Sequence, residues 1–359
     1  MKKLIKPAAL QTGDTVATIS LSFGGAGLFK ERYAQGKRQI EETFGVHVIE
    51  TTHALCSPQE LYDHPEWRLA DLKEAFLNPK IKAIICNIGG DDSVRLLSLM
   101  TESDFDLIRN HPKILMGLSD PTVIHFMCYR AGLSSFYGPM TLFGLAENGG
   151  ISEYTRQNII KALFCSDPIG VLPENKEGFI VERLDWATDN KTLRQKEAST
   201  PWRYIGADKI VQGRLIGGCF DVLAELMNGT NLYPPTEDFE DTILFLETSE
   251  GRPSPESVSF WMRNLGAKGI LKQIKGLLFA RPGGEFSPDK TTEKEAYLNT
   301  YPLYDEVLLK GLKEYGAHIP VVTNMDFGHT CPHLVLPYGA LTQINPTEKT
   351  VRILESGVL

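Results

Sequence analysis

A predominantly apolar segment, Ile81–Ile88, is the feature that most limits how this chain can fold. Strands of this kind are buried on both faces, as in parallel sheets that helices cover on each side. The segment follows an amphipathic helix expected at 66–77. Earlier in the chain, a helix expected at 30–43 lies between strands expected at 14–20 and 46–49. This alternation of strand and helix predicts a parallel α/β sheet.

The segment Lys113–Arg130 repeats the order of strand, glycine and helix. It begins with the end of a buried strand, and apolar residues at helical spacing follow from Val123. Between them, Asp120 suits the N-cap and Pro121 the first helical position. Ser119 is therefore expected on a sharp elbow that lifts its hydroxyl above the sheet edge, close to free N–H groups of the helix start. This is the geometry of a serine nucleophile, although Ser119 could instead only cap the helix beside Asp120.

A second glycine turn, GGDDS at 89–93, follows the strand at 81–88. Both turns come at the carboxyl ends of their strands, which is the edge where open α/β sheets bind ligands. If the turns face one another, the backbone N–H groups of Gly90 and Asp120 would form an oxyanion hole. The simpler interpretation is that Gly89 and Gly90 only permit a turn.

The whole chain has the composition of an ordinary globular protein. Its 359 residues, 42% of them hydrophobic, can bury sizeable cores and favour two domains. A net charge of -8 and the lack of any Lys/Arg run argue against binding to a nucleic acid polymer or an anionic membrane. No apolar run has the length of a membrane span or a signal peptide, so we expect a cytoplasmic protein. Six cysteines without CxxC pairs are expected to be reduced core thiols.

Composition divides the chain into three parts. Residues 1–165 are expected to form the N-terminal α/β domain with the elbow, and residues 209–359 a C-terminal domain. Residues 166–208 mix prolines and charges with Trp186 and no sustained period, which is typical of an inter-domain connection. The C-terminal part is expected to contain strands at 242–246, 274–279 and 320–323 and helices at 220–227, 255–265 and 304–315.

A serine nucleophile needs a base and an orienting carboxylate. Most of the eight histidines are poorly placed, and His125 lies on the elbow helix pointing along it. His329 follows a buried strand of the C-terminal part, and Glu247 ends another strand. The order Ser, Glu, His occurs in α/β-hydrolases, but Pro121 replaces the final glycine of their elbow, which disfavours that fold.

Five segments in order make the chain recognisable. It resembles the LD-carboxypeptidase family of serine peptidases along essentially its whole length, in GGDDS at 89–93, GLSDPT at 117–122, GRLIGGCFDVL at 213–223, LFLE with SEGRPSPESV at 244–258, and FGH at 327–329. The resemblance implies an N-terminal parallel α/β domain with a smaller, β-rich C-terminal domain, and a homodimer. It also implies Ser119 as nucleophile, His329 as general base, Glu247 as its orienter, and the N–H groups of Gly90 and Asp120 as oxyanion donors. Such a triad needs no cofactor and no metal.

The long connection around Trp186 makes the chain more similar to the microcin C immunity proteins than to the murein LD-carboxypeptidases. That similarity implies hydrolysis of an amide between an amino acid and a modified nucleotide, with Trp186 stacked on the base. Trp186 could instead be an ordinary buried or surface aromatic. A murein LD-carboxypeptidase that removes the terminal D-Ala of tetrapeptides is the alternative activity.

Three rival interpretations remain at the level of sequence. His329, Cys331 and His333 form His-x-Cys-x-His, a weak zinc signal without a further ligand pair. Asp91 and Asp92 could bind Mg²⁺, although adjacent acids at a helix start more often interact with its dipole. A non-catalytic protein whose two lobes close on a small ligand would explain the glycine turns, but it would leave Glu247 and His329 without a role.

Overall fold

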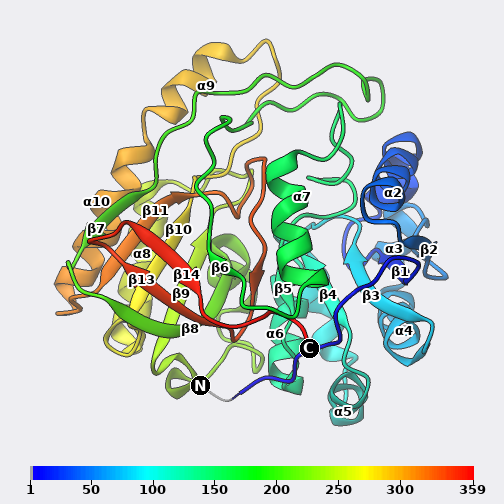
Figure 1. Cartoon of the computed structure of the whole chain (residues 1–359), viewed down its shortest axis with the longest axis horizontal. Coiled ribbons are helices and arrows are strands. Elements are labelled where there is room, and N and C mark those ends of the chain that lie inside the picture. The colour runs from blue at the N-terminus through cyan, green and yellow to red at the C-terminus, as the bar shows by residue number, and fades with distance from the viewer. Residues whose placement is uncertain (1–2) are drawn as a thin grey trace.

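Two β-sheets lie side by side in the computed structural model, which describes residues 3–359 (Figure 1). All but one strand of the first sheet, with its helices, run from blue to green in Figure 1, and most of the second sheet lies between yellow-green and red. One buried apolar cluster includes strands of both sheets, for example Ile84 of the first and Leu244 of the second. The predicted α/β fold with two unequal parts is confirmed.

The first sheet has six strands in the order β12-β5-β4-β3-β1-β2. Strands β1 to β5 run parallel, as the apolar strand at 81–88 predicts, and β12 joins the edge antiparallel. The strands are β1 (Thr15–Ile19), β2 (His47–Glu50), β3 (Ile81–Cys86), β4 (Ile114–Gly117), β5 (Phe136–Tyr137) and β12 (Leu336–Pro337). Because β12 comes from the end of the chain, the C-terminal part is tied into the first sheet.

Helices connect the strands of the first sheet. The longer ones are α2 (Lys30–Phe44), α4 (Pro65–Leu77), α5 (Glu102–Asn110) and α6 (Thr122–Ala131). Shorter ones are α1 (Gly25–Leu28), α3 (Pro58–Asp63), η1 (Ser93–Ser98), α7 (Glu153–Ile159) and η2 (Ile160–Phe164). The helix expected after GGDDS is only the 3₁₀ turn η1, and α5 follows it with a capping box at Thr101 and Asp104.

The second sheet has eight strands in the order β6-β14-β13-β8-β9-β10-β11-β7. Its centre is parallel: β8 (Val211–Cys219), β9 (Thr242–Glu247), β10 (Gly276–Ala280) and β11 (Pro320–Met325). Antiparallel strands extend both edges: β6 (Gly170–Val171), β7 (Arg203–Gly206), β13 (Leu341–Asn345) and β14 (Thr350–Ile353).

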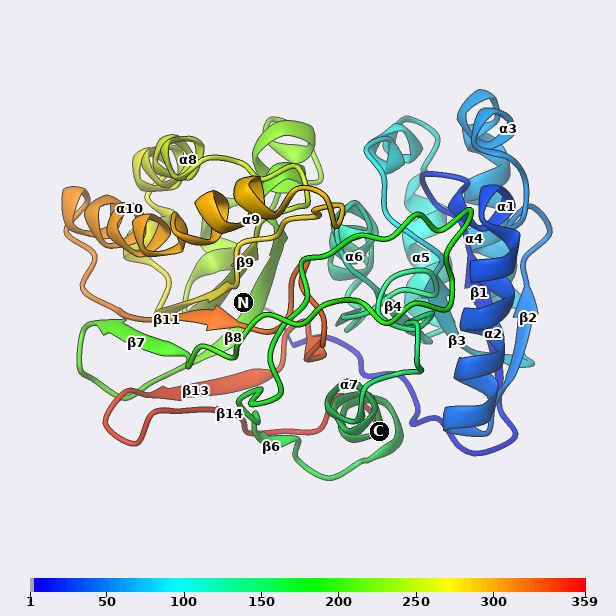
Figure 2. The ribbon, with the colours of Figure 1, turned by 90° about the horizontal axis from the view of Figure 1, so that it is seen from above.

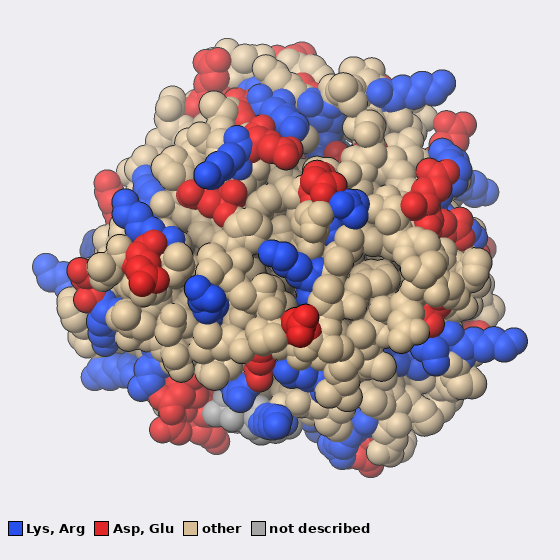
Figure 3. Space-filling model, viewed as in Figure 1, with Lys and Arg blue, Asp and Glu red and all other residues tan. Residues whose placement is uncertain are grey.

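Helices α8 and α10 pack against each other along one face of the second sheet (Figure 2). The helices of this part are α8 (Pro255–Ala267), α9 (Thr291–Leu298), α10 (Tyr301–Glu314), η3 (Val222–Met227), η4 (Thr236–Phe239) and η5 (Ile270–Lys272). None of the helices within residues 3–359 is both long and apolar enough to cross a bilayer. On the face seen in Figure 3, basic and acidic side chains are interspersed rather than gathered by sign.

The connection at 166–208 is more structured than its lack of period suggests. It supplies the edge strands β6 and β7, and Ile180 pairs with Cys331 while Glu182 pairs with Phe286 in isolated bridges. These contacts fix the segment against the loops that follow β10 and β11. The domain boundaries at 165 and 209 remain predictions, because the segment between them contributes strands to the second sheet.

Close contact between β8 and β9 depends on Gly217. Its φ is +155°, and a Cβ at this position would lie 1.7 Å from the carbonyl oxygen of Phe245. Gly217→Ala should therefore lower the free energy of unfolding by more than about 4 kcal/mol, the range of exceptional single substitutions. Gly229→Ala is the control, because its φ is +93° but no atom lies within 4 Å of the added Cβ. The control should cost only about 1 to 2 kcal/mol. Urea unfolding measures both, and equal losses would contradict this account.

Candidate active site

Ser119 lies in the turn between β4 and α6, with a left-handed φ of 70°. This backbone conformation costs a non-glycine residue about 1 to 3 kcal/mol and persists where surrounding contacts impose it, often at functional sites. Here the N–H of Ser119 donates to the hydroxyl of Tyr137 at 3.0 Å. The predicted elbow is confirmed, and Gly132 ends α6 in the left-handed conformation, as expected.

Asp120 does not cap α6, contrary to the sequence expectation. The helix begins at Thr122 after Pro121 and has no side-chain cap hydrogen bond, so Ser119 does not cap it either. The Asp120 carboxylate instead accepts a hydrogen bond from the N–H of Ser93 at 2.9 Å, across to the other glycine turn. Its burial raises the pKa of Asp120. The carboxylate therefore joins the two turns rather than stabilising one helix.

The two glycine turns face one another, as predicted from their places at the sheet edge. A Cβ on Gly89 would lie 3.0 Å from both Cβ and Oγ of Ser119, so this glycine permits close approach as well as a turn. Gly90 has a φ of +144°, and a Cβ there would lie 2.3 Å from Oγ of Ser22. The N–H groups of Gly90 and Asp120 donate to no other residue within 3–359. Gly90 is the one of the two that lines the cavity over this site, whereas Asp120 is fully buried.

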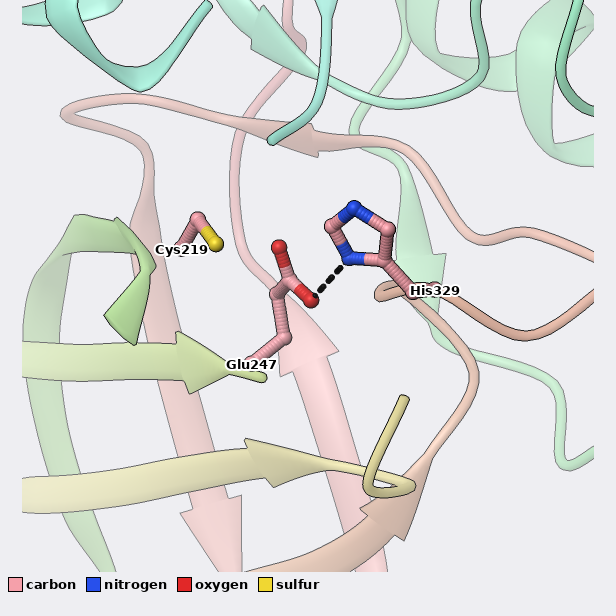
Figure 4. Close-up of side chains that lie close together, drawn as sticks. All are labelled: Cys219, Glu247 and His329. Atoms are coloured by element: carbon pink, nitrogen blue, oxygen red, sulfur yellow. Dashed lines mark hydrogen bonds and ion pairs between the residues drawn. The ribbon is translucent and has the colours of Figure 1, made fainter. Parts of the chain in front are cut away.

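Glu247 and His329 come together from the second sheet (Figure 4). Glu247 ends β9, His329 follows β11, and Oε2 of Glu247 lies 2.6 Å from Nδ1 of His329. Glu247 is completely buried. The glycine of the FGH segment is needed for this approach, because a Cβ on Gly328 would lie 2.7 Å from Cβ of Glu247.

The carboxylates around His329 favour the charged form of its imidazole. Burial by itself would lower the pKa of His329, but the adjacent Glu247 carboxylate, and then Glu250 and Asp221, raise it to about 10. Glu250 is the second carboxylate at the ring, with Oε2 3.1 Å from Nε2. A base for a serine must offer an unprotonated Nε2, so these carboxylates decide the pH at which His329 can act as one.

Tyr137 links the turn at Ser119 to the carboxylate of Glu247. The sequence did not suggest this link. Its hydroxyl accepts from the N–H of Ser119 and donates to Oε1 of Glu247. The ring is completely buried, and burial together with the Glu247 charge raises the pKa of Tyr137 well above its usual value. Only the pairing of β5 with β4 brings this hydroxyl to the site, and no motif marks it.

A cavity of about 370 Å³ lies over these residues. Ser119, Gly90 and His329 line it, together with Trp186 and Arg183 from the connection. The cavity therefore brings the candidate nucleophile and the candidate base to one space, together with the backbone around one proposed oxyanion donor.

Trp186 is 9% exposed and packed rather than free. The guanidinium carbons of Arg32 and Arg183 lie 4.5 and 5.5 Å from its ring centroid. The edge of Phe29 meets the ring with centroids 5.6 Å apart. A nucleobase would therefore stack on this ring only if the half-exposed Arg183 shifted.

The metal interpretations find little support in the described part of the chain. The one group of His, Cys, Asp or Glu close enough to share an ion is Cys219, Glu247 and His329, drawn in Figure 4. In that group Glu247 and His329 already bind each other, and burial raises the pKa of the Cys219 thiol well above its usual value. A protonated thiol is a poor zinc ligand.

The two metal sites suggested by the sequence, the His-x-Cys-x-His segment and the Asp91–Asp92 pair, do not bring their side chains together around one ion. Several of these side chains have other partners or are unsuited to a metal. Cys331 lies 3.0 Å from the Arg194 guanidinium. Burial lowers the pKa of His333 to about 3. Asp92 pairs with Arg68 and Arg95.

Two family profiles and several relatives match this chain. The profile of the LD-carboxypeptidase N-terminal domain matches residues 16–138, and that of the C-terminal domain matches residues 212–344. The microcin C7 self-immunity protein MccF of Escherichia coli is 28% identical over 97% of this chain and 95% of its own. A probable murein peptide carboxypeptidase of Bacillus subtilis is 26% identical over 98% of this chain and 95% of its own.

Two solved structures are similar over nearly the whole chain. One is an MccF-like protein from Streptococcus pneumoniae in complex with AMP, with a TM-score of 0.79, 27% identity and coverage of 95% of this chain and 98% of that one. The other is MccF in complex with aspartyl sulfamoyl adenosine, with a TM-score of 0.81, 25% identity and coverage of 99% and 100%.

The hydroxyl of Tyr137 can be tested by Tyr137→Phe, which removes only that oxygen. Because the hydroxyl supports a charged carboxylate, its loss should lower kcat by about ten- to a hundredfold, the worth of a hydrogen bond to a charged group. KM should change little, since Tyr137 is not among the residues that line the cavity. Steady-state amide hydrolysis provides both numbers, and an unchanged kcat would exclude a role for this hydroxyl.

Proposed function

Since this chain belongs to the LD-carboxypeptidase family and is a serine hydrolase, we propose that Ser119, His329 and Glu247 form its catalytic triad and that its substrates are aminoacyl-nucleotide amides. One observation carries the first part of this proposal. A serine in a strained, left-handed turn lines the same cavity as a histidine that is bonded to a buried carboxylate. The strained backbone of Ser119 and the buried pair of His329 and Glu247 each lower the stability of the fold. A shared role in catalysis would explain why both are present.

The proposed reaction uses each of these groups in turn. Nε2 of His329 takes the proton of Ser119 as Oγ attacks the substrate carbonyl carbon. Glu247 holds Nδ1–H, fixes the tautomer and stabilises the imidazolium that forms. The free N–H groups of Gly90 and Asp120 receive the oxyanion. The amine leaves with the proton from His329. His329 then takes a proton from water as the water attacks the acyl-enzyme, and it returns a proton to Ser119 as the acid product leaves.

The nucleotide part of the proposal rests on Trp186 and on the relatives. The ring lines the cavity, and a base could stack on it once Arg183 shifts from its face. Solved structures of MccF and an MccF-like protein contain an aminoacyl nucleotide analogue and AMP. Removal of the terminal D-Ala of murein tetrapeptides is the second candidate, because a murein peptide carboxypeptidase is about as similar.

Two further expectations belong to the same proposal. The family resemblance leads us to expect a homodimer, and the pattern of apolar residues leads us to expect a cytoplasmic protein. Neither bears on the chemistry proposed for the triad.

Removal of the nucleophile gives the strongest expected effect. Ser119→Ala should lower kcat by about a millionfold, as loss of a triad serine does in other serine hydrolases. His329→Ala should be similarly severe and Glu247→Gln milder, because an orienting group is partly dispensable. Single-turnover assays at high enzyme concentration measure the residual rates. A Ser119→Ala protein that keeps more than a tenth of wild-type activity would refute the triad.

The role of Trp186 is tested with two substrates on one variant. Stacking on a base is worth about 1 to 3 kcal/mol, so Trp186→Ala should raise KM for an aminoacyl-nucleotide amide about five- to a hundredfold. A small amide without a base should be hydrolysed with nearly unchanged KM, because it does not reach the ring. A folding defect would lower activity on both substrates. Equal changes in KM, or none, would exclude stacking and favour the murein tetrapeptide.

A further inference from the structure

His329 has a carboxylate beside each ring nitrogen, and only one of them serves the proposed triad. Glu247 lies at Nδ1 and Glu250 at Nε2, 3.1 Å away. Nε2 is the atom that has to accept the proton of Ser119. While Glu250 remains there, its charge adds to that of Glu247 in favouring the protonated imidazole, so Nε2 is a poorer base at neutral pH. Nε2 therefore becomes a better base when Glu250 moves away or loses its charge.

The two carboxylates differ in their freedom to move. Glu247 is completely buried and bonded to Tyr137 as well as His329. The Glu250 side chain is 48% exposed, and its carboxylate has no second partner within residues 3–359. Rotation of one side chain is therefore enough to free Nε2.

The backbone that carries Glu250 is fixed on both sides. The N–H of Ser249 donates to Asp221 at 2.9 Å, and the N–H of Arg252 donates to the carbonyl of Ser249 at 3.1 Å. One residue earlier, the Thr248 hydroxyl accepts from the N–H of Gly283 at 2.9 Å. The turn thus presents the carboxylate at the cavity without moving itself.

The charges in the cavity indicate which kind of ligand group could compete with His329 for the Glu250 carboxylate. Its acidic lining residues are Asp91, Glu250 and Glu285, and Arg183 is its only Lys or Arg within the described chain. Arg183 is already paired with Glu285. Two carboxylates, Asp91 and Glu250, are therefore left for a cationic group, and an anionic group beside them would be repelled.

We propose that Glu250 is a specificity-determining residue that binds the free amino group of the substrate's acyl part and, in doing so, releases Nε2 of His329. A substrate with an ammonium group next to the scissile carbonyl thereby activates its own base. This inference rests on the proposed function, since it assigns the trigger for the same triad. It narrows the substrates to amides whose acyl group has an unblocked amine.

The pH at which His329 becomes neutral depends on all the titratable groups that face its ring. These are Glu247 at the end of β9, Cys219 and Asp221 at and after β8, Glu250 in the turn, and His333 in the loop of His329 itself. Neutralising Glu250 removes one of the negative charges that favour the imidazolium. The pKa of His329 should then fall, so the neutral base should be available at lower pH.

The selectivity test compares Glu250→Gln with wild type on one aminoacyl amide, with its amine either free or acetylated. The variant should lose about ten- to a hundredfold in kcat/KM on the free amine, as expected for a lost hydrogen bond to a charged group. It should hydrolyse the acetylated amide at least as fast as wild type does. Glu250→Ala should lose the same selectivity, which guards against an effect of the new amide group. An unchanged preference for the free amine in both variants would overturn the proposal.

The pH test uses inactivation by an uncharged fluorophosphonate, which needs neutral His329 but no amine. In Glu250→Gln the midpoint of the pH profile should fall by about one pH unit or more. Asp91→Asn removes the same charge from the cavity without touching His329, so its midpoint should match wild type. Coinciding midpoints for Glu250→Gln and wild type would refute the release of the base. If wild type itself is not labelled, the triad fails and this proposal fails with it.

Discussion

The site depends on the junction between the two sheets, where α6 meets the end of β8. The N–H of Cys219 donates to Oγ1 of Thr122 at 3.0 Å. Thr122 lies only three residues after Ser119 in the sequence. A Cβ on Gly218 would lie 2.6 Å from Cγ2 of Thr122, so no side chain could separate the two elements. Since Ser119 belongs to one sheet and Glu247 and His329 to the other, this contact fixes their relative positions.

Buried polar contacts extend that junction to the His329 loop. Asp326, three residues before His329, accepts from the Arg281 guanidinium at 3.0 Å and from the Trp202 indole at 2.9 Å. Arg281 and Asp326 are both fully buried, so breaking the pair would leave an uncompensated charge. Trp202 belongs to the connection, which explains why a segment without sequence period still has a defined path. The connection, the base and the second sheet are thus held as one unit.

The sequence was sufficient for the features that local chemistry determines. The apolar strands, Gly132 at the end of α6 and the elbow at Ser119 each follow from residue types within a few positions. The placement of Asp120 failed because a distant N–H, that of Ser93, competes with the helix start for its carboxylate. Tyr137 and Glu250 could not be found, because their roles depend on atoms that only the sheet pairing and the turn after β9 bring near His329. Long-range contacts, rather than local propensity, decide such cases.

In the proposed mechanism, Ser119 is the one hydroxyl that a general base activates. The most direct measurement is treatment of the intact protein with a fluorophosphonate, followed by peptide mass mapping of the adduct. We predict one adduct per chain on the peptide that contains Ser119, and its loss in His329→Ala, in which Ser119 remains but the base is gone. No adduct, or an adduct on another residue, would contradict the assignment and favour a protein that binds its ligand without cleaving it.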